Sequence, residues 1–207
     1  MSMRNWIFAG VAIFSIAAPG AALAQRAAGG PPDWPCVQRL VPELSASAIW
    51  RGPAIDSLDK KWWSDSEIGP LVRFAVARAT SQEDALARVS AFAQQMPEEE
   101  KDTRLTMLFS GLFEKISTER TRTIDKIRSY SRGQVRQLEA IGTIVDDLEA
   151  ARSAEDAEKI ARLEQEIFWE KRLFDSRQAS LRALCEQPYL LEERLSRLVR
   201  AMQPAKK

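Results

Sequence analysis

The chain has 207 residues, of which 45% are apolar and 29% are charged, with 30 basic and 29 acidic groups. This length and composition fit one modest globular domain, and they exclude general disorder and a multi-span membrane protein. Histidine is absent, which excludes a Ser-His-Asp triad, an imidazole metal ligand and a histidine general base.

Residues 1–24 have the pattern of a secretory signal peptide. Arg4 supplies a positive start, residues 6–18 are mostly apolar, and Ala22-Leu23-Ala24 is a small-x-small cleavage motif. The alternative is an uncleaved anchor helix, which the intervening Pro19-Gly20 break disfavours. We therefore expect a periplasmic or secreted protein with no stable membrane insertion after cleavage. The mature chain has 29 basic and 29 acidic groups, which argues against nucleic-acid binding.

The two cysteines, Cys36 and Cys185, are far apart in the chain. In an exported protein they predict a disulfide. Such a bridge would stabilise the fold by roughly 4–5 kcal/mol in the chain-entropy model, because it restricts the unfolded chain. The alternative is two free thiols, one of them catalytic. It is disfavoured because the chain has neither a C-x-x-C motif nor a histidine to generate a thiolate.

Residues 25–65 form an irregular N-terminal arm that is rich in tryptophan and proline. The cluster Gly29-Gly30-Pro31-Pro32 breaks regular structure at its start. Large apolar side chains gain free energy by leaving water, so we expect the arm to pack on the base of a helical domain. A sugar- or peptide-binding arm is the alternative. The tryptophans of the arm are Trp34, Trp50, Trp62 and Trp63.

The helical domain is expected to span residues 66–207. Ser64-x-x-Glu67 and Ser81-x-x-Asp84 have the form of capping boxes, which predicts short helices over 66–79 and 82–95. Pro70 gives an alternative start for the first helix.

Two long helical arms, 98–152 and 154–202, are predicted to follow. Pro97 opens the first arm, and Ser153-x-x-Asp156 has the form of a third capping box. Apolar residues in the second arm recur every seven positions at Ile160, Ile167, Phe174 and Leu181, which is typical of a coiled-coil seam. We therefore predict an all-α fold built on a long antiparallel helical hairpin. Gly133 and Pro188 leave open whether each arm is continuous, and a compact bundle is the alternative.

An aromatic cluster in the second arm is the candidate partner-binding surface. Its residues cover more of the helix circumference than one narrow seam can bury. Either a partner or the short helices at 66–95 must cover the excess. The cluster consists of Phe168, Trp169, Leu173 and Phe174.

Three arginines in the first arm, Arg128, Arg132 and Arg136, recur at four-residue steps and share a helix face. They are candidates for contact with an anion or an acidic partner, and the alternative is a solvated face balanced by acids on the neighbouring arm. The acidic residues near the hairpin tip leave a hard cation open as a ligand, although no EF-hand spacing occurs. We expect no cofactor and no metal.

The sequence thus favours a non-enzymatic binding, scaffold or assembly factor for another envelope protein. The second interpretation is a periplasmic chaperone or envelope-stress protein. This chain resembles such proteins in size, export signal and hairpin character. It departs from their Leu-Thr-x-x-Gln signature, because Leu105-Thr106-Met107-Leu108-Phe109 has Phe where the signature has Gln. An enzyme comes third, and homodimer formation is left open.

Overall fold

The computed structural model describes residues 30–203, so the predicted signal peptide and the first residues of the arm lie outside the described part. The described residues form helices and no strand. They are the α-helices α1 (Ala46–Ile49), α2 (Ile68–Val76), α3 (Gln82–Gln94), α4 (Glu98–Ser153) and α5 (Ala157–Met202), with 3₁₀ turns at Ile55–Ser57 and Trp62–Ser64.

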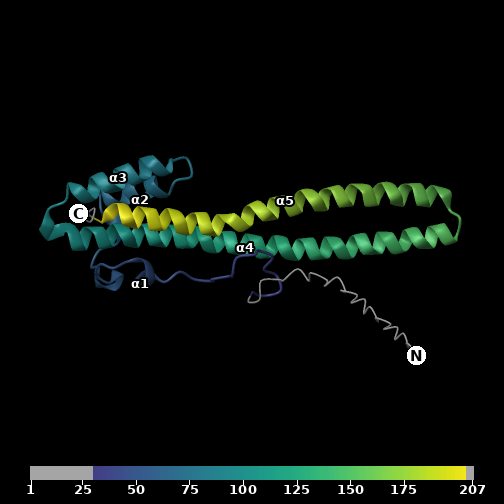
Figure 1. Cartoon of the computed structure of the whole chain (residues 1–207), viewed down its shortest axis with the longest axis horizontal. Coiled ribbons are helices and arrows are strands. Elements are labelled where there is room, and N and C mark those ends of the chain that lie inside the picture. The colour runs from purple at the N-terminus through teal and green to yellow at the C-terminus, as the bar shows by residue number, and fades with distance from the viewer. Residues whose placement is uncertain (1–29, 204–207) are drawn as a thin grey trace, which may run out of the picture.

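The long helices α4 and α5 lie side by side as an antiparallel hairpin (Figure 1), which confirms the predicted fold class. At 1.5 Å per residue, the 56 residues of α4 extend about 80 Å. The predicted heptad positions Ile160 and Ile167 pack around Leu148, Ala151 and Leu163 near the tip. Leu181 packs further along the same seam with Ile127. The seven-residue repeat of the second arm therefore turns one stripe of α5 toward α4, as predicted.

The base of the hairpin carries the main core. Helices α2 and α3 pack there against α4 and α5 (Figure 1), so the long helices gain a third layer only at this end. The fully buried side chains of this core include Ile68, Val72, Val89, Leu108, Phe109, Leu112, Leu195 and Leu198.

Gly111 permits this close packing. A Cβ atom at this position would lie 2.7 Å from Val72 Cγ2 and 2.8 Å from the ring of Trp62. Real Cβ atoms do not approach other heavy atoms so closely. A glycine that is unfavourable for helix propensity is therefore required by tertiary packing.

We expect Gly111→Ala to destabilise the protein by about 1–3 kcal/mol, because overpacking outweighs the better helix propensity of alanine. Urea unfolding followed by circular dichroism measures this. Gly133→Ala is the matched control, since the contact that its Cβ makes among the described residues is an ordinary one, 3.8 Å from the end of Arg136, and it should be neutral or stabilising. Equal effects of the two substitutions would contradict this role for Gly111.

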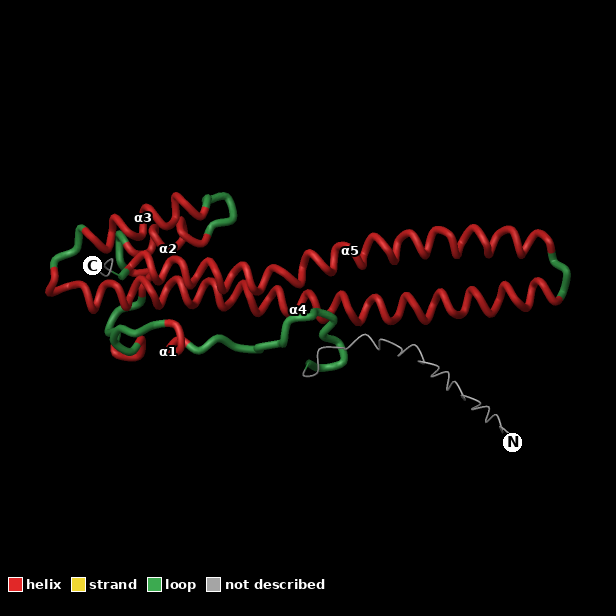
Figure 2. The backbone as a smooth tube through the Cα atoms, viewed as in Figure 1, coloured by secondary structure: helices red, strands yellow, loops and turns green. Residues whose placement is uncertain are grey.

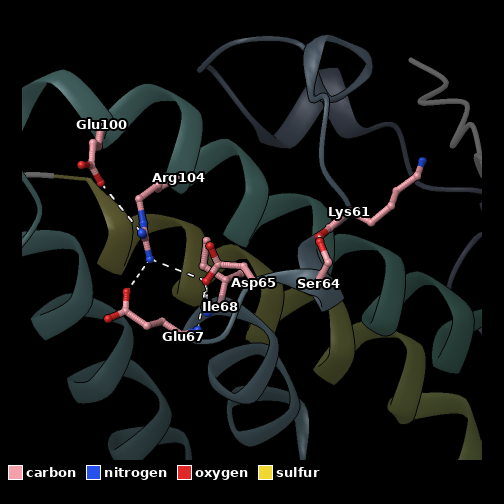
Figure 3. Close-up of polar contacts among 7 residues, drawn as sticks. All are labelled: Lys61, Ser64, Asp65, Glu67, Ile68, Glu100 and Arg104. Atoms are coloured by element: carbon pink, nitrogen blue, oxygen red, sulfur yellow. Dashed lines mark hydrogen bonds and ion pairs between the residues drawn. The ribbon is translucent and has the colours of Figure 1, made fainter.

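The start of α2 differs from the prediction. Asp65 caps this helix, because its Oδ1 accepts hydrogen bonds of 2.9 Å from the backbone N–H groups of Glu67 and Ile68 (Figure 3). The Ser64 hydroxyl donates instead to the Lys61 carbonyl, so the predicted Ser64–Glu67 capping box is wrong. An Asp at this position can reach both N–H groups at once, which leaves the serine free for the preceding turn.

The surroundings of Asp65 favour the charged form of its carboxyl group. Burial opposes its ionisation, but the two backbone N–H groups and the nearby Arg104 together hold the pKa of Asp65 below its ordinary value. Arg104 also pairs with Glu67 and lies 3.8 Å from Glu100 (Figure 3). This network ties the start of α2 to the first turns of α4.

One half of the predicted capping box of α3 is confirmed: the Ser81 hydroxyl caps the helix, whereas the Asp84 carboxylate accepts that hydroxyl and not the Ser81 backbone N–H. Ser81 is the N-cap, and its Oγ accepts the Asp84 backbone N–H at 3.0 Å. The serine hydroxyl also lies 2.7 Å from the Asp84 carboxylate. The Ser81 side chain therefore satisfies one N–H group of a helix end that would otherwise lack an acceptor.

The hairpin tip is a tight turn over residues 154–156. The Asp156 N–H bonds the Ala151 carbonyl and the Glu155 N–H bonds the Arg152 carbonyl, which is a Schellman motif. Ser153 ends α4, and Asp156 alone caps α5 by accepting the Lys159 N–H. The predicted Ser153–Asp156 box is therefore wrong, because the turn needs three residues between the two helices.

Glu155 has φ of 55°, a left-handed conformation that glycine adopts without steric cost. We expect Glu155→Gly to raise the free energy of unfolding by roughly 0.5–1 kcal/mol. Chemical denaturation measures the gain. Glu158→Gly, inside the first turn of α5, should lower it, and a loss of stability in Glu155→Gly would contradict this account of the tip.

Both long helices are continuous at the two residues where the sequence left a break possible. α4 passes through Gly133 without a break, and α5 passes through Pro188, which is buried. α5 changes direction between its green and yellow parts in Figure 1. We attribute this bend to Pro188, because a proline lacks the N–H that would bond the Leu184 carbonyl.

Candidate interaction surface

The N-terminal arm follows the base and middle of the hairpin along α4 (Figure 2). Trp50 stacks on Phe109 with ring centroids 4.8 Å apart. Trp62 is buried, and its indole N–H donates to Glu114 at 2.9 Å. The arm is thus an outer layer of the fold, as expected from its content of large apolar groups, and Trp63 is the tryptophan that stays mainly exposed.

A buried arginine holds the centre of the arm. Arg120 on α4 donates to the Val41 carbonyl at 2.6 Å, to the Pro42 carbonyl at 3.2 Å and to Glu192 on α5 at 2.6 Å. A buried guanidinium is tolerated only when its donors are satisfied, and here the arm supplies two of the three acceptors. The Arg120 guanidinium therefore joins the arm, α4 and α5.

The predicted disulfide Cys36–Cys185 is confirmed. It joins the arm to α5 across a separation of 149 residues, with the two Cα atoms 5.5 Å apart. Both cysteines pack with Trp34, Ile127, Leu181 and Leu184 in a small apolar cluster. A bridge of this kind is typical of proteins from oxidising compartments.

Two of the three arginines predicted to contact an anion bind an acidic residue of the same chain. Asp33 accepts Arg128 Nε at 3.0 Å and Arg132 Nη1 at 2.5 Å. The balancing acid thus comes from the arm, whereas the alternative placed it on the neighbouring helix. Arg136 forms no ion pair with another residue of 30–203, and its contact with an acidic partner stays a prediction.

The contact of Asp33 with Arg128 and Arg132, called the Asp33 clamp here, stabilises the charge of the Asp33 carboxylate. The hydrogen bond from Arg128 is the main reason that the pKa of Asp33 lies below its ordinary value; burial opposes the shift and Arg132 adds to it. A lowered native pKa means that the clamp stabilises the fold above the ordinary aspartate value of 3.8. This stabilisation is lost as the pH falls through the native pKa.

We expect Asp33→Asn to lower the melting temperature at neutral pH by no more than a few degrees, because the ion pairs are partly exposed. The difference from the unsubstituted chain should shrink toward zero below the native pKa of Asp33, where the carboxyl is protonated. Thermal unfolding across this pH range measures both. Asp59→Asn is the control at an exposed acid, and an Asp33→Asn difference independent of pH would contradict the clamp.

The part of the hairpin beyond this clamp, from residue 134 to residue 174, consists of α4 and α5 alone and is called the distal half here. No other described segment reaches it (Figures 1 and 2). Its seam begins with a polar layer, in which Gln137 Nε2 donates to Glu170 and Gln137 Oε1 accepts from Arg177. Gln134 is buried, donates to the Phe174 carbonyl at 3.3 Å and has an unpaired Oε1.

The predicted aromatic cluster lies on the distal half of α5. Phe168, Trp169 and Leu173 are 52%, 57% and 43% exposed. Phe174 is half-buried at the seam, so the structure separates it from the other three. Helices α2 and α3 pack at the base of the hairpin and do not cover this cluster (Figure 1), which removes one of the two explanations for its excess apolar area.

The cluster has a cationic member that the sequence reasoning missed. Phe168 and Trp169 meet edge to face at 5.2 Å, and the Arg172 guanidinium carbon lies 5.7 Å from the first ring and 5.9 Å from the second. The signal was available, since Arg172 follows Phe168 by four residues and Trp169 by three, and such neighbours meet on a helix surface. We call Phe168, Trp169, Arg172 and Leu173 the α5 patch.

A pocket of about 560 Å³ lies at the base between the α2–α3 connection, α4 and α5. Three of its charged groups have polar partners that hold them in place: Arg78 pairs with Glu119, and Arg194 donates to the carbonyls of Ala75 and Thr80. Lys115 instead lies over the ring of Trp62. Burial lowers the pKa of Arg194. These contacts hold α2 and α3 onto the hairpin.

Within residues 30–203, acidic and thiol side chains do not gather in threes in an arrangement that could hold a metal ion. Among the same residues, no helix has an apolar run of the length needed to cross a bilayer.

Comparison with protein-family models, with curated proteins and with solved structures finds no match to this chain.

Proposed function

We propose that the protein is an exported, non-enzymatic binding or assembly factor whose α5 patch binds an acidic, amphipathic segment of another envelope protein. The observation that carries the proposal is the exposure of three large apolar side chains, Phe168, Trp169 and Leu173, beyond the reach of every described covering segment. Aromatic residues and arginine are enriched where protein partners bind.

The chemistry of the patch favours an acidic partner. Arg172 lies over the two aromatic rings and forms no ion pair with another residue of 30–203. A carboxylate on a partner helix that also carries apolar groups would complement both parts of this surface. The disulfide and the predicted signal peptide support an oxidising envelope compartment as the place of action.

We expect a tagged, exported chain to form cross-links to one recurring envelope protein through residues near Trp169. Phe168→Ala combined with Trp169→Ala should reduce this capture about tenfold or more, because truncation of hot-spot aromatics costs about 2 kcal/mol or more. Cross-linking in the native envelope with mass spectrometry measures the capture and locates the contact.

The matched control is Tyr189→Ala combined with Leu190→Ala. These neighbours are also exposed on α5, but they lie outside the distal half. Capture that survives the Phe168 and Trp169 change, with helicity unaltered, would contradict the proposal. Suppression of aggregation of several unrelated unfolded proteins, dependent on the same patch, would instead support the chaperone interpretation.

A further inference from the structure

A second surface, on α4 and mostly in the distal half, has no role in the proposed function. Six residues recur alternately four and three positions apart, so they lie along one stripe of the helix. They are Ser131, Val135, Leu138, Gly142, Val145 and Glu149. We call this set the α4 stripe.

The α4 stripe does not face α5. Each of its members from Val135 to Glu149 follows a seam residue by one position, and one residue rotates about 100° around the helix. The seam residues Gln134, Gln137 and Leu148 are buried. By contrast, Val135, Leu138 and Val145 are 54%, 52% and 41% exposed. A seam-like pattern is thus repeated on a face that nothing in the described chain covers.

Gly142 lies near the middle of this stripe. A Cβ atom there would meet nothing within 4 Å among residues 30–203, so packing within this part of the chain does not require the glycine, in contrast to Gly111. Glycine in the interior of a helix costs about 1 kcal/mol relative to alanine. Its one structural effect in the stripe is a notch in the helix surface, one turn from the protruding Leu138.

Charge is segregated on either side of the stripe centre. Residues 126–138 contain four basic groups and no acidic group, whereas residues 139–150 contain four acidic groups and no basic group. A helix with this pattern is complementary to an antiparallel copy of itself. A parallel copy would place like charges against each other.

We propose that two copies of the chain associate through their α4 stripes in antiparallel orientation, about a two-fold axis midway between Leu138 and Gly142. In this register Leu138 of each copy enters the Gly142 notch of the other, and Val135 lies against Val145. Arg132 reaches the level of Asp146 of the second copy. The contact is isologous, and it converts two exposed hairpins into a four-helix layer.

A glycine pair tests the notch in the full exported chain with its disulfide intact. Gly142→Leu should weaken dimerisation by roughly tenfold or more, because the new side chain fills the space that Leu138 of the second copy needs. Gly133→Leu is the matched control. It is nine residues away on the opposite face of α4, and among the described residues a Cβ there meets only a flexible arginine end at 3.8 Å.

Sedimentation equilibrium over micromolar concentrations measures the association of both variants, and thermal unfolding checks that both remain folded. Dimers that are lost in Gly142→Leu and kept in Gly133→Leu support the inference. A chain that is monomeric throughout this range overturns it, as does a dimer that Gly142→Leu leaves intact. Trp169→Ala should leave dimerisation unchanged, so failure here is distinct from failure of the proposed function.

A charge exchange tests the orientation. Arg132→Glu and Asp146→Arg should each weaken self-association a few-fold, since each places like charges together. An equimolar mixture of the two should recover the association, because both contacts then join opposite charges. Mixing cannot restore the Arg132 contact with Asp33, so recovery reports the contact between copies. A mixture that associates no better than either variant alone overturns the antiparallel register.

Discussion

Two helices that pack side by side bury one stripe each, and everything else about this protein follows from how the remaining faces are covered. At the base, α2, α3 and the N-terminal arm supply further layers, and the apolar side chains between these layers form a buried core. In the distal half no described segment does so, and large apolar groups stay exposed on both helices. Exposed apolar groups gain free energy by leaving water, and this contrast is the basis for both proposed interfaces.

The arm decides where that contrast begins. It is fixed at three successive points along the hairpin: by Trp50 and Trp62 at the base, by Arg120 in the middle, and by Cys36 and Asp33 at its far end. These contacts differ in kind, since they use apolar burial, a satisfied buried cation, a covalent bond and a partly exposed ion pair. The arm is therefore held to the hairpin along its length, and the polar glutamine layer that follows it marks the start of the distal half.

The glycines of α4 show how one residue type serves different purposes in one helix. The ring of Trp62 and the side chain of Val72 leave no space for a Cβ atom at Gly111, so packing within the chain requires this glycine. Gly142 has space around it among the described residues and sits in a repeated apolar stripe at a change of charge, and the proposed dimer gives it a role. Local helix propensity disfavours both equally. Only the surroundings of each glycine distinguish them.

The sequence alone determined the helices, the hairpin and the disulfide pair. Apolar spacing, proline and capping residues act over a few neighbouring positions, and two cysteines leave one intrachain pairing. Tertiary structure decided the partner of Arg128 and Arg132, the cap of α2 and the exposure of Phe168, Trp169 and Leu173. These depend on which distant segment reaches a given face, and sequence spacing carries no information about that distance. The pattern shows which faces are apolar, and only the fold shows which of them are covered.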